Sequence, residues 1–174
     1  MKKIEAIKLE TERLVLRKRM EDDIPFMVKM FNTNDVIKYL GGYPPKDEHS
    51  MLKIIRHRNE NQWVVTLKEN NNYIGECFFQ KIVDNYLGEI GYIFSKEYWG
   101  KGYAYEAVSK IIDYSINVLK LKRLCVRINE KNIRSKKLIE KLDFEFISLI
   151  PEGDLGGSVA DYCYYTKKIN QNYV

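Results

Sequence analysis

The hydrophobic pattern of this chain changes period most clearly between positions 87 and 119. Leu87 to Phe94 is an apolar run, rich in aromatic and branched residues and bounded by turn residues, which predicts a buried strand. From Tyr103 onward the apolar positions follow the i, i+3, i+4, i+7 spacing of a helix core face, and they are Ala104, Ala107, Val108, Ile111, Ile112, Ser115, Val118 and Leu119. The pattern therefore predicts a strand that passes through a short loop into an amphipathic helix.

The chain before this unit shows shorter alternating and helical patterns. Acidic residues from Glu21, followed by Pro25, are typical of a helix start, and Asp47 is a candidate cap for a later helix. The predicted elements are a strand over Thr11–Arg19, helices over Glu21–Phe31, Asn32–Leu40 and Asp47–Glu60, a loop over Gly41–Pro45, and strands over Gln62–Lys68 and Tyr73–Val83. The turn residues Glu69 to Asn72 suit a hairpin, so the last two strands and Leu87–Phe94 predict a meander.

The chain after this unit predicts one more strand, one helix and a closing strand pair. Arg123 to Ile128 is a short strand, and the helix before it implies a crossover that makes it parallel to Leu87–Phe94. Asn132 is a candidate cap for a helix whose shared face holds Ser135, Leu138, Ile139 and Leu142. Phe144–Ile150 and Val159–Lys167 follow as two strands around a flexible loop. The element order predicts one mixed α/β domain over residues 1–174.

The loop between the first strand and helix contains Gly100-Lys101-Gly102. A glycine-bearing loop at a helix N-terminus presents several backbone N–H groups with a partial positive charge, which is a cradle for an anion such as a diphosphate. The alternative is that two glycines only shape a tight turn. Two other phosphate motifs fit less well, because Tyr105 stands where a dinucleotide fingerprint needs a small residue and Gly102 stands where a P-loop needs Ser or Thr.

The composition argues against a secreted protein, a membrane protein and a metal-binding protein. A length of 174 residues with 45% hydrophobic content suits one globular domain, and without a signal peptide or a membrane-length apolar run we expect a cytoplasmic protein. Three cysteines, Cys77, Cys125 and Cys163, form no C-x-x-C pair, so we expect buried thiols in a reducing compartment. His49 and His57 have no ligand partners at metal spacing, and we expect no metal site.

The positive charge is concentrated in one segment. The formal net charge is +5, and Lys120 to Lys137 contains eight basic residues and one acid. A nucleic-acid binder needs a broad basic footprint, whereas one patch beside the glycine loop suits a small ligand that carries several phosphate charges. The alternative is a solvated lysine-rich face.

Two motifs resemble a known superfamily. Glu89-Ile90-Gly91-Tyr92 with Trp99-Gly100-Lys101-Gly102-Tyr103-Ala104 resembles the pyrophosphate-binding segment of the GNAT acyl-CoA N-acyltransferases, in particular the RimJ/RimL-like branch, and Trp99 stands where Gln or Arg is commonest. Asn132-Ile133-Arg134-Ser135 resembles the second motif, N-x-x-S. The opening T-E-R-L-V-L-R from Thr11 with its paired helices also resembles this branch, in which those helices help to wall the acceptor site. The resemblance implies a mixed, mostly antiparallel sheet flanked by helices, with a splayed parallel strand pair that binds acetyl-CoA.

The resemblance also implies the cofactor contacts. Backbone groups of the first strand would pair with the pantetheine amides, and one of their N–H groups would polarise the thioester carbonyl. Gly91 would fit a bulge there, and the alternative is that a glycine inside a strand marks close packing. The expected cofactor-binding residues are Tyr92, Ile93, Phe94, Trp99, Gly100, Lys101, Gly102, Tyr103, Ala104, Tyr105, Asn132, Arg134 and Ser135.

Two residues are candidates for proton transfer. Glu89 matches a glutamate that some members use as a base, but it lies about 13 Å from Ile93 along an ideal strand, so it would act through water or a bulge. Glu76 is the rival base, and either glutamate can instead be an ion-paired strand residue. Many members place a tyrosine acid at the position held here by Ile139, which leaves Ser135 as the available hydroxyl. Its alternative role is a first-turn serine bonded to backbone.

These observations predict an enzyme that transfers the acetyl group from acetyl-CoA to a primary amine, either a protein N-terminus or a small molecule. The alternatives are a polyamine or aminoglycoside acetyltransferase, a non-catalytic acyl-CoA-binding domain, or a nucleic-acid binder that uses the basic segment. Tyr162, Tyr164 and Tyr165 either line an acceptor pocket or pack in strands. The expected partners are acetyl-CoA and the amine, with no nucleic acid, membrane or metal, in a monomer or homodimer.

Overall fold

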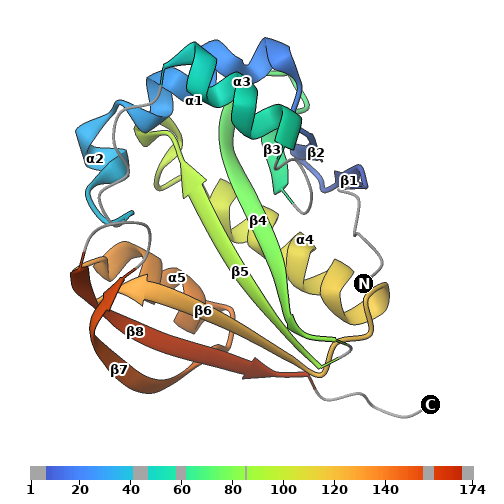
Figure 1. Cartoon of the computed structure of the whole chain (residues 1–174). Coiled ribbons are helices and arrows are strands. Elements are labelled where there is room, and N and C mark those ends of the chain that lie inside the picture. Colours follow the sequence, from blue (N-terminus) through green and yellow to red (C-terminus); the bar gives the residue numbers. More distant parts are fainter. Residues whose placement is uncertain (1–6, 41–46, 58–61, 85, 155–158, 170–174) are drawn as a thin grey trace.

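An eight-stranded mixed sheet forms the centre of the molecule (Figure 1). The computed structural model describes residues 7–40, 47–57, 62–84, 86–154 and 159–169. The strands lie in the order β1-β2-β3-β4-β5-β6-β8-β7. Their bounds are Leu9–Glu10 for β1, Leu14–Lys18 for β2, Gln62–Leu67 for β3, Tyr73–Val83 for β4, Leu87–Phe94 for β5, Arg123–Asn129 for β6, Glu145–Asp154 for β7 and Val159–Lys168 for β8.

Helices cover both faces of this sheet. They are α1 (Ile24–Phe31), α2 (Asn34–Ile37), α3 (Glu48–His57), α4 (Tyr103–Asn117) and α5 (Ile133–Lys141), with 3-10 turns at Glu21–Asp23 and Lys96–Tyr98. One apolar cluster joins the sheet to α4 and α5 through residues such as Ile111 and Ile139, and a second joins it to α1, α2 and α3 through residues such as Met27 and Met51. In Figure 1, α4 and α5 lie behind the sheet and α1 and α3 lie across its upper end.

The parallel strand pair diverges after three residues. β5 and β6 are paired only through Leu87–Arg123, Gly88–Leu124 and Glu89–Cys125. β5 nevertheless stays paired with β4 as far as Phe94, on its other edge. The rest of β5 therefore has an edge toward β6 that carries no ladder partner there, and Figure 1 shows the two strands separating.

Most predicted elements are confirmed. β3, β4 and β5 form the antiparallel meander, and β5 and β6 are parallel. Both predicted caps are present: the Asp47 carboxylate accepts the Ser50 backbone N–H at 2.6 Å, and the Asn132 side chain accepts the Ser135 backbone N–H at 3.1 Å. Cys77, Cys125 and Cys163 are buried free thiols. The fold class predicted from the sequence is confirmed.

Several boundaries differ from the predictions. The strand expected over Thr11–Arg19 begins only at Leu14, because the chain bends at Glu12 and Arg13, and β1 lies before the expected range. Val118, expected in the core, is 59% exposed because α4 ends at Asn117. The flexible loop was expected over Pro151–Ser158, but β7 continues to Asp154, so residues 151–154, the part of that loop that the structure describes, are strand. The predicted loop Gly41–Pro45 lies outside the described residues.

Gly91 does not lie in the predicted bulge. The β4–β5 register is continuous from Lys81–Gly88 to Gly75–Phe94, and its one irregularity is at Lys81–Val83. A Cβ on Gly91 would lie 1.9 Å from the Phe78 ring, its cross-strand partner. Because Gly91 has no side chain, the Phe78 ring can pack directly against the strand backbone. Such close packing is a common reason for a glycine inside a strand.

Among the described residues, no helix is long and apolar enough to cross a membrane. The His, Cys, Asp and Glu side chains of the same residues form no group of three or more that could hold a metal ion.

Candidate active site

The loop between β5 and α4 has the geometry of an anion cradle. Gly100 and Gly102 both have positive φ angles, +74° and +83°, a region that residues with a Cβ rarely adopt. Gly102 caps α4, and the Glu106 N–H makes the first bond of the helix, to the Gly102 carbonyl at 3.0 Å. The N–H groups of 103–105 precede that bond, so they have no carbonyl one turn earlier within the helix and are available to an anion.

Trp99 connects this loop to both neighbouring elements. Its indole Nε1–H donates to the Phe94 carbonyl at 2.7 Å, and the Arg134 guanidinium lies over its ring at 4.9 Å. The Phe94 carbonyl, an expected pantetheine contact, is therefore already bound by the protein's own indole. The ring of Tyr105 likewise lies 4.9 Å from the Lys141 ammonium of α5. The start of α4, the loop and α5 thus gather cations and aromatic rings around the cradle.

The predicted basic segment is not one patch, which corrects the sequence-based expectation. Lys120, Lys122 and Arg123 lie where β6 begins, next to the start of β5, because the Lys122 and Arg123 N–H groups donate to the Tyr86 carbonyl. β6 then runs seven residues, roughly 23 Å, before Arg134 reaches the cradle. Only the part after β6 lies beside the loop, because a strand separates charges that are close in sequence.

Arg13 ties the cradle to β2, a contact that sequence reasoning missed. Its Nε donates to the Glu106 carboxylate at 2.7 Å, and its Nη1 donates to the Lys101 carbonyl at 3.1 Å. The Thr11 hydroxyl donates to the same carboxylate at 2.5 Å. The available signal was the T-E-R-L motif, in which Thr11 and Arg13 stand two residues apart. Burial alone raises the pKa of Glu106, but the hydrogen bonds from Thr11 and Arg13 outweigh it and hold the pKa below its usual value.

Tyr92 and Ser135 meet beside the divergence of β5 and β6. The Tyr92 hydroxyl lies 2.6 Å from Ser135 Oγ and 3.3 Å from the Ser135 carbonyl, and both side chains are partly buried. Burial raises the pKa of Tyr92, and the Ser135 hydrogen bond opposes that effect without cancelling it. The phenol therefore stays protonated at neutral pH.

The two candidate bases are both paired with arginine. The Glu89 carboxylate accepts hydrogen bonds from Arg127 Nε at 2.7 Å and Nη2 at 2.9 Å, and Glu89 is 5% exposed. Glu76 forms a similar bidentate pair with Arg19, in which both side chains are buried. The hydrogen bonds that Arg127 donates to the Glu89 carboxylate raise the pKa of the Arg127 guanidinium, which therefore stays charged. Sequence reasoning named both glutamates but neither partner.

Successive β5 side chains face opposite sides of the sheet. Tyr92 packs with the cluster of α4 and α5, and Ile93 packs with the cluster of α1 and α3. Glu89 is an even number of residues from Ile93 and lies on the same side. The Glu89 carboxylate and the Tyr92–Ser135 pair therefore approach the diverging strands from opposite faces.

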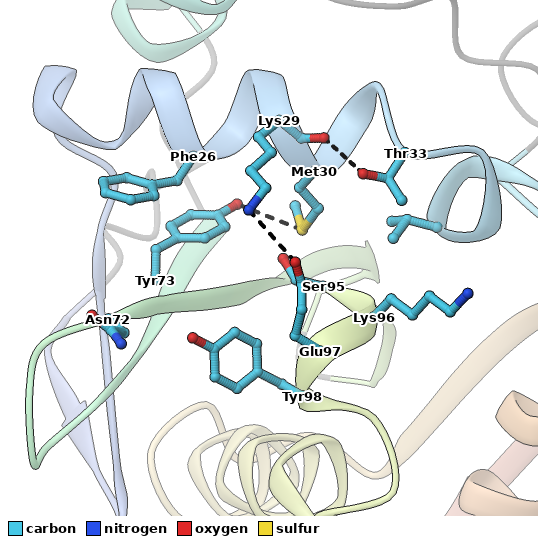
Figure 2. Close-up of a pocket in the computed structure, with 11 residues that line it drawn as sticks. Phe26, Lys29, Met30, Thr33, Asn72, Tyr73, Ser95, Lys96, Glu97 and Tyr98 are labelled. Carbon is cyan, nitrogen blue, oxygen red and sulfur yellow. Dashed lines mark hydrogen bonds and ion pairs between the residues drawn. The ribbon is translucent and has the colours of Figure 1, made fainter.

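A pocket of about 360 Å³ lies between α1 and the segment after β5 (Figure 2). Figure 2 shows Phe26 and Tyr73 stacked beneath α1 and Lys29 reaching toward Glu97, with which it forms an ion pair at 3.5 Å. Lys96 pairs with Asp35 of α2 beside it. The lining residues are Phe26, Lys29, Met30, Thr33, Val36, Asn72, Tyr73, Ser95, Lys96, Glu97 and Tyr98.

The closing-strand tyrosines do not line this pocket. Tyr165 packs in the α4–α5 cluster, and its hydroxyl donates to Glu140 at 3.0 Å. Tyr162 is 2% exposed. For these two residues, the packing interpretation holds.

Comparison with known proteins identifies the family. The sequence profile described as "Acetyltransferase (GNAT) domain" matches residues 13–145, which is most of the chain. The chain belongs to the GNAT acetyltransferase family. It is 34% identical over 145 residues, 79% of this chain and 82% of the other, to an uncharacterized N-acetyltransferase, p20, from Bacillus licheniformis. This GNAT protein is therefore an acetyl-CoA-dependent N-acetyltransferase.

Two solved structures share the fold of this GNAT enzyme. Spermidine N-acetyltransferase from Vibrio cholerae, in complex with CoA and spermine, has a TM-score of 0.78 at 21% identity, with 91% of this chain and 96% of that chain covered. RimL, a ribosomal L7/L12 alpha-N-protein acetyltransferase in complex with coenzyme A, has a TM-score of 0.77 at 17% identity, with 94% and 98% covered. The glycine cradle, the first-turn N–H groups and the adjacent Arg134 suit the diphosphate of CoA.

Proposed function

We propose that this GNAT enzyme catalyses direct attack of a primary amine on acetyl-CoA, in the gap where β5 and β6 diverge. The observation that carries the proposal is that the gap begins at Glu89 and has Ser135 beside it, with the anion cradle following the end of β5. The cradle binds the diphosphate, with Lys101 and Arg134 nearby. The free edge of β5 at Tyr92 and Ile93 binds the pantetheine amides, and its backbone N–H groups polarise the thioester carbonyl.

Ser135 supplies the proton that the leaving sulfur needs. The Asn132 cap holds the Ser135 backbone N–H, and the side chain is directed toward Tyr92 on the facing strand. Ile139, at the position where many family members have tyrosine, is fully buried and has no acidic hydrogen. The Ser135 hydroxyl is the acid that the described helix α5 offers at this gap.

Glu89, acting through water, accepts the proton that the amine loses. Its partner Arg127 has a side chain that is 36% exposed, whereas the Arg19 side chain that pairs with Glu76 is 7% exposed. Water can therefore reach the Glu89 pair, while the Glu76 pair is enclosed by protein. Glu76 has a structural role instead, because a buried carboxylate that lost its arginine partner would destabilise the fold.

We further propose that the acceptor is an amine of low positive charge, such as the N-terminal amino group of a peptide. Glu76 and Glu89 are neutralised by arginines, and at the α1 pocket Asp35 and Glu97 are neutralised by lysines. A polyamine carries several positive charges and needs acidic groups that have no basic partner. Each of these four carboxylates already has one. RimL acts on a protein N-terminus, which agrees with this choice of acceptor.

An amine panel with thiol detection tests the proposal. Peptides with free N-termini are expected to show higher kcat/KM than spermidine or an aminoglycoside, and N-terminally blocked peptides are the matched controls. Higher kcat/KM for spermidine would reject the low-charge acceptor. CoA binding without thiol release from any amine would instead indicate a non-catalytic binding domain.

Three variants test the residue roles in the same assay. Ser135→Ala and Glu89→Gln are expected to lower kcat by roughly 10²-fold or more, because proton transfer by a positioned group contributes about 10²–10⁴-fold, while CoA affinity by calorimetry is retained. Glu76→Gln is the control carboxylate variant, expected to lose thermal stability more than kcat. Unchanged kcat in Glu89→Gln would assign the base elsewhere.

A further inference from the structure

We propose that the Tyr92 phenol is a positioning residue that orients the Ser135 hydroxyl and strengthens it as a proton donor. This inference rests on the proposed role of Ser135 in acetyl transfer. It assigns to the Tyr92 side chain a function that is separate from the backbone contacts of the same residue. The contact that carries it is the 2.6 Å approach of the two hydroxyl oxygens.

The Tyr92–Ser135 contact spans the diverging strands. Ladder pairing between β5 and β6 ends at Glu89 and Cys125, and Tyr92 is three residues beyond that point. Ser135 lies in the first turn of α5, which directly follows β6. One side-chain hydrogen bond therefore joins the two sides of the gap beyond the last β5–β6 backbone pair. This gap is where the thioester sulfur is proposed to lie.

The relative acidities of the two hydroxyls set the direction of the hydrogen bond. A phenol, with an ordinary pKa near 10, is far more acidic than a serine alcohol and is the better donor. The Tyr92 hydrogen is therefore given to Ser135 Oγ at 2.6 Å in preference to the Ser135 carbonyl, an acceptor at 3.3 Å, and the Ser135 hydrogen is left to point into the gap. Burial keeps the Tyr92 phenol protonated, because it raises the pKa of that group.

Two further contacts fix the serine. Asn132 Oδ1 accepts the Ser135 backbone N–H at 3.1 Å, which holds the first turn of α5. The Tyr92 hydroxyl also lies 3.3 Å from the Ser135 carbonyl, so its position is defined relative to two atoms of the same residue. The Tyr92 ring packs against the α4–α5 core cluster, which restricts the phenol to this location.

The proposed reaction moves one proton, in net terms, from the amine to the leaving sulfur. The amine nitrogen forms the bond to the acetyl carbon, the carbon–sulfur bond breaks, and the sulfur takes the Ser135 hydroxyl hydrogen. Ser135 Oγ regains a hydrogen from Tyr92, and the phenolate is reprotonated by solvent, to which Glu89 returns the proton that it accepted through water from the amine. No oxidant, reductant or further reactant is needed.

Tyr92→Phe tests the proposal, because it keeps the ring and removes only the hydroxyl. We expect kcat to fall by about 10-fold or more, while KM for acetyl-CoA and CoA affinity stay within about twofold. A Tyr92→Phe/Ser135→Ala double variant is expected to be no slower than Ser135→Ala alone, because the two residues act as a unit. Wild-type kcat in Tyr92→Phe, or multiplied losses in the double variant, would overturn the inference.

A second measurement needs no acceptor. The absorbance of the bound CoA thiolate is followed against pH in wild type and Tyr92→Phe. A hydroxyl that donates to the thiolate lowers the pKa of the bound thiol, so the variant is expected to ionise it at a pH about one unit higher. Equal midpoints would reject the positioning role of Tyr92. Equal midpoints in wild type and Ser135→Ala would instead reject the proposed Ser135 donor, which separates the two claims.

Discussion

Gly102 shows how one residue supports the cradle in two ways. Its φ of +83° costs about 1–2 kcal/mol for a residue with a Cβ, and a Cβ there would lie 3.3 Å from the Arg13 guanidinium. Gly100 shares the positive φ, but a Cβ there would meet no atom within 4 Å. The two glycines therefore differ in their neighbours and not in their backbone strain.

Gly102→Ala is expected to weaken CoA binding about 10-fold or more, because it strains the helix N-terminus and displaces Arg13. Gly100→Ala is the matched control, with a similar loss of thermal stability and a smaller loss of affinity. Calorimetric titration with CoA and thermal unfolding check both. Equal affinity losses in the two variants would show that Arg13 contributes nothing through this contact.

At the scale of elements, β2 holds the N-terminus of α4. Arg13 binds the Glu106 carboxylate and the Lys101 carbonyl, and its guanidinium lies 4.6 Å from the centre of the Tyr103 ring. The loop that carries the cradle is thereby fastened to a strand far away in the sequence. This contact explains why the opening T-E-R-L segment belongs with the glycine loop.

Glu106→Gln is expected to raise KM for acetyl-CoA several-fold, with little change in kcat at saturation, and to lower stability at neutral pH by about 1 kcal/mol. Because the folded pKa of Glu106 is held below its usual value, its stabilising contribution is present above the unfolded pKa and is lost as pH falls through the folded pKa. The stability difference between wild type and variant should therefore shrink in acid. A difference that stays constant down to low pH, measured by denaturant unfolding, would contradict the pairing.

At the scale of the whole molecule, ligand binding couples the cradle to global stability. α4, β5 and α5 all contribute to the cradle and to the main core cluster, so a ligand held there favours the folded state. At a CoA concentration of 100 times Kd the stabilisation is about 2.7 kcal/mol, which for a domain of this size corresponds to a Tm increase of roughly 5–10 °C. Acetyl-CoA and CoA should both raise Tm, and NAD should not. An equal response to NAD would show that the cradle recognises diphosphates in general.

Local patterns in the sequence were sufficient for the elements and for the cradle. Leu87–Phe94 and the helix start at Tyr103 could be predicted because strand and helix periods, glycine backbone freedom and N-terminal N–H groups depend on neighbouring residues. Asn132 could be predicted as a cap for the same reason. Asp143 has a φ of +60° at the end of α5, a local conformation that aspartate tolerates better than most residues.

Only the tertiary structure decided which distant groups meet. It inserts β8 between β6 and β7, pairs Glu89 with Arg127, separates the two ends of the basic segment, and brings Tyr92 to Ser135 across the diverging strands. The Glu89–Arg127 and Tyr92–Ser135 contacts join residues 38 and 43 positions apart, so no local period encodes them. The sequence by itself determined the family, the elements and the glycine loop, and tertiary packing decided the partners of each candidate catalytic group.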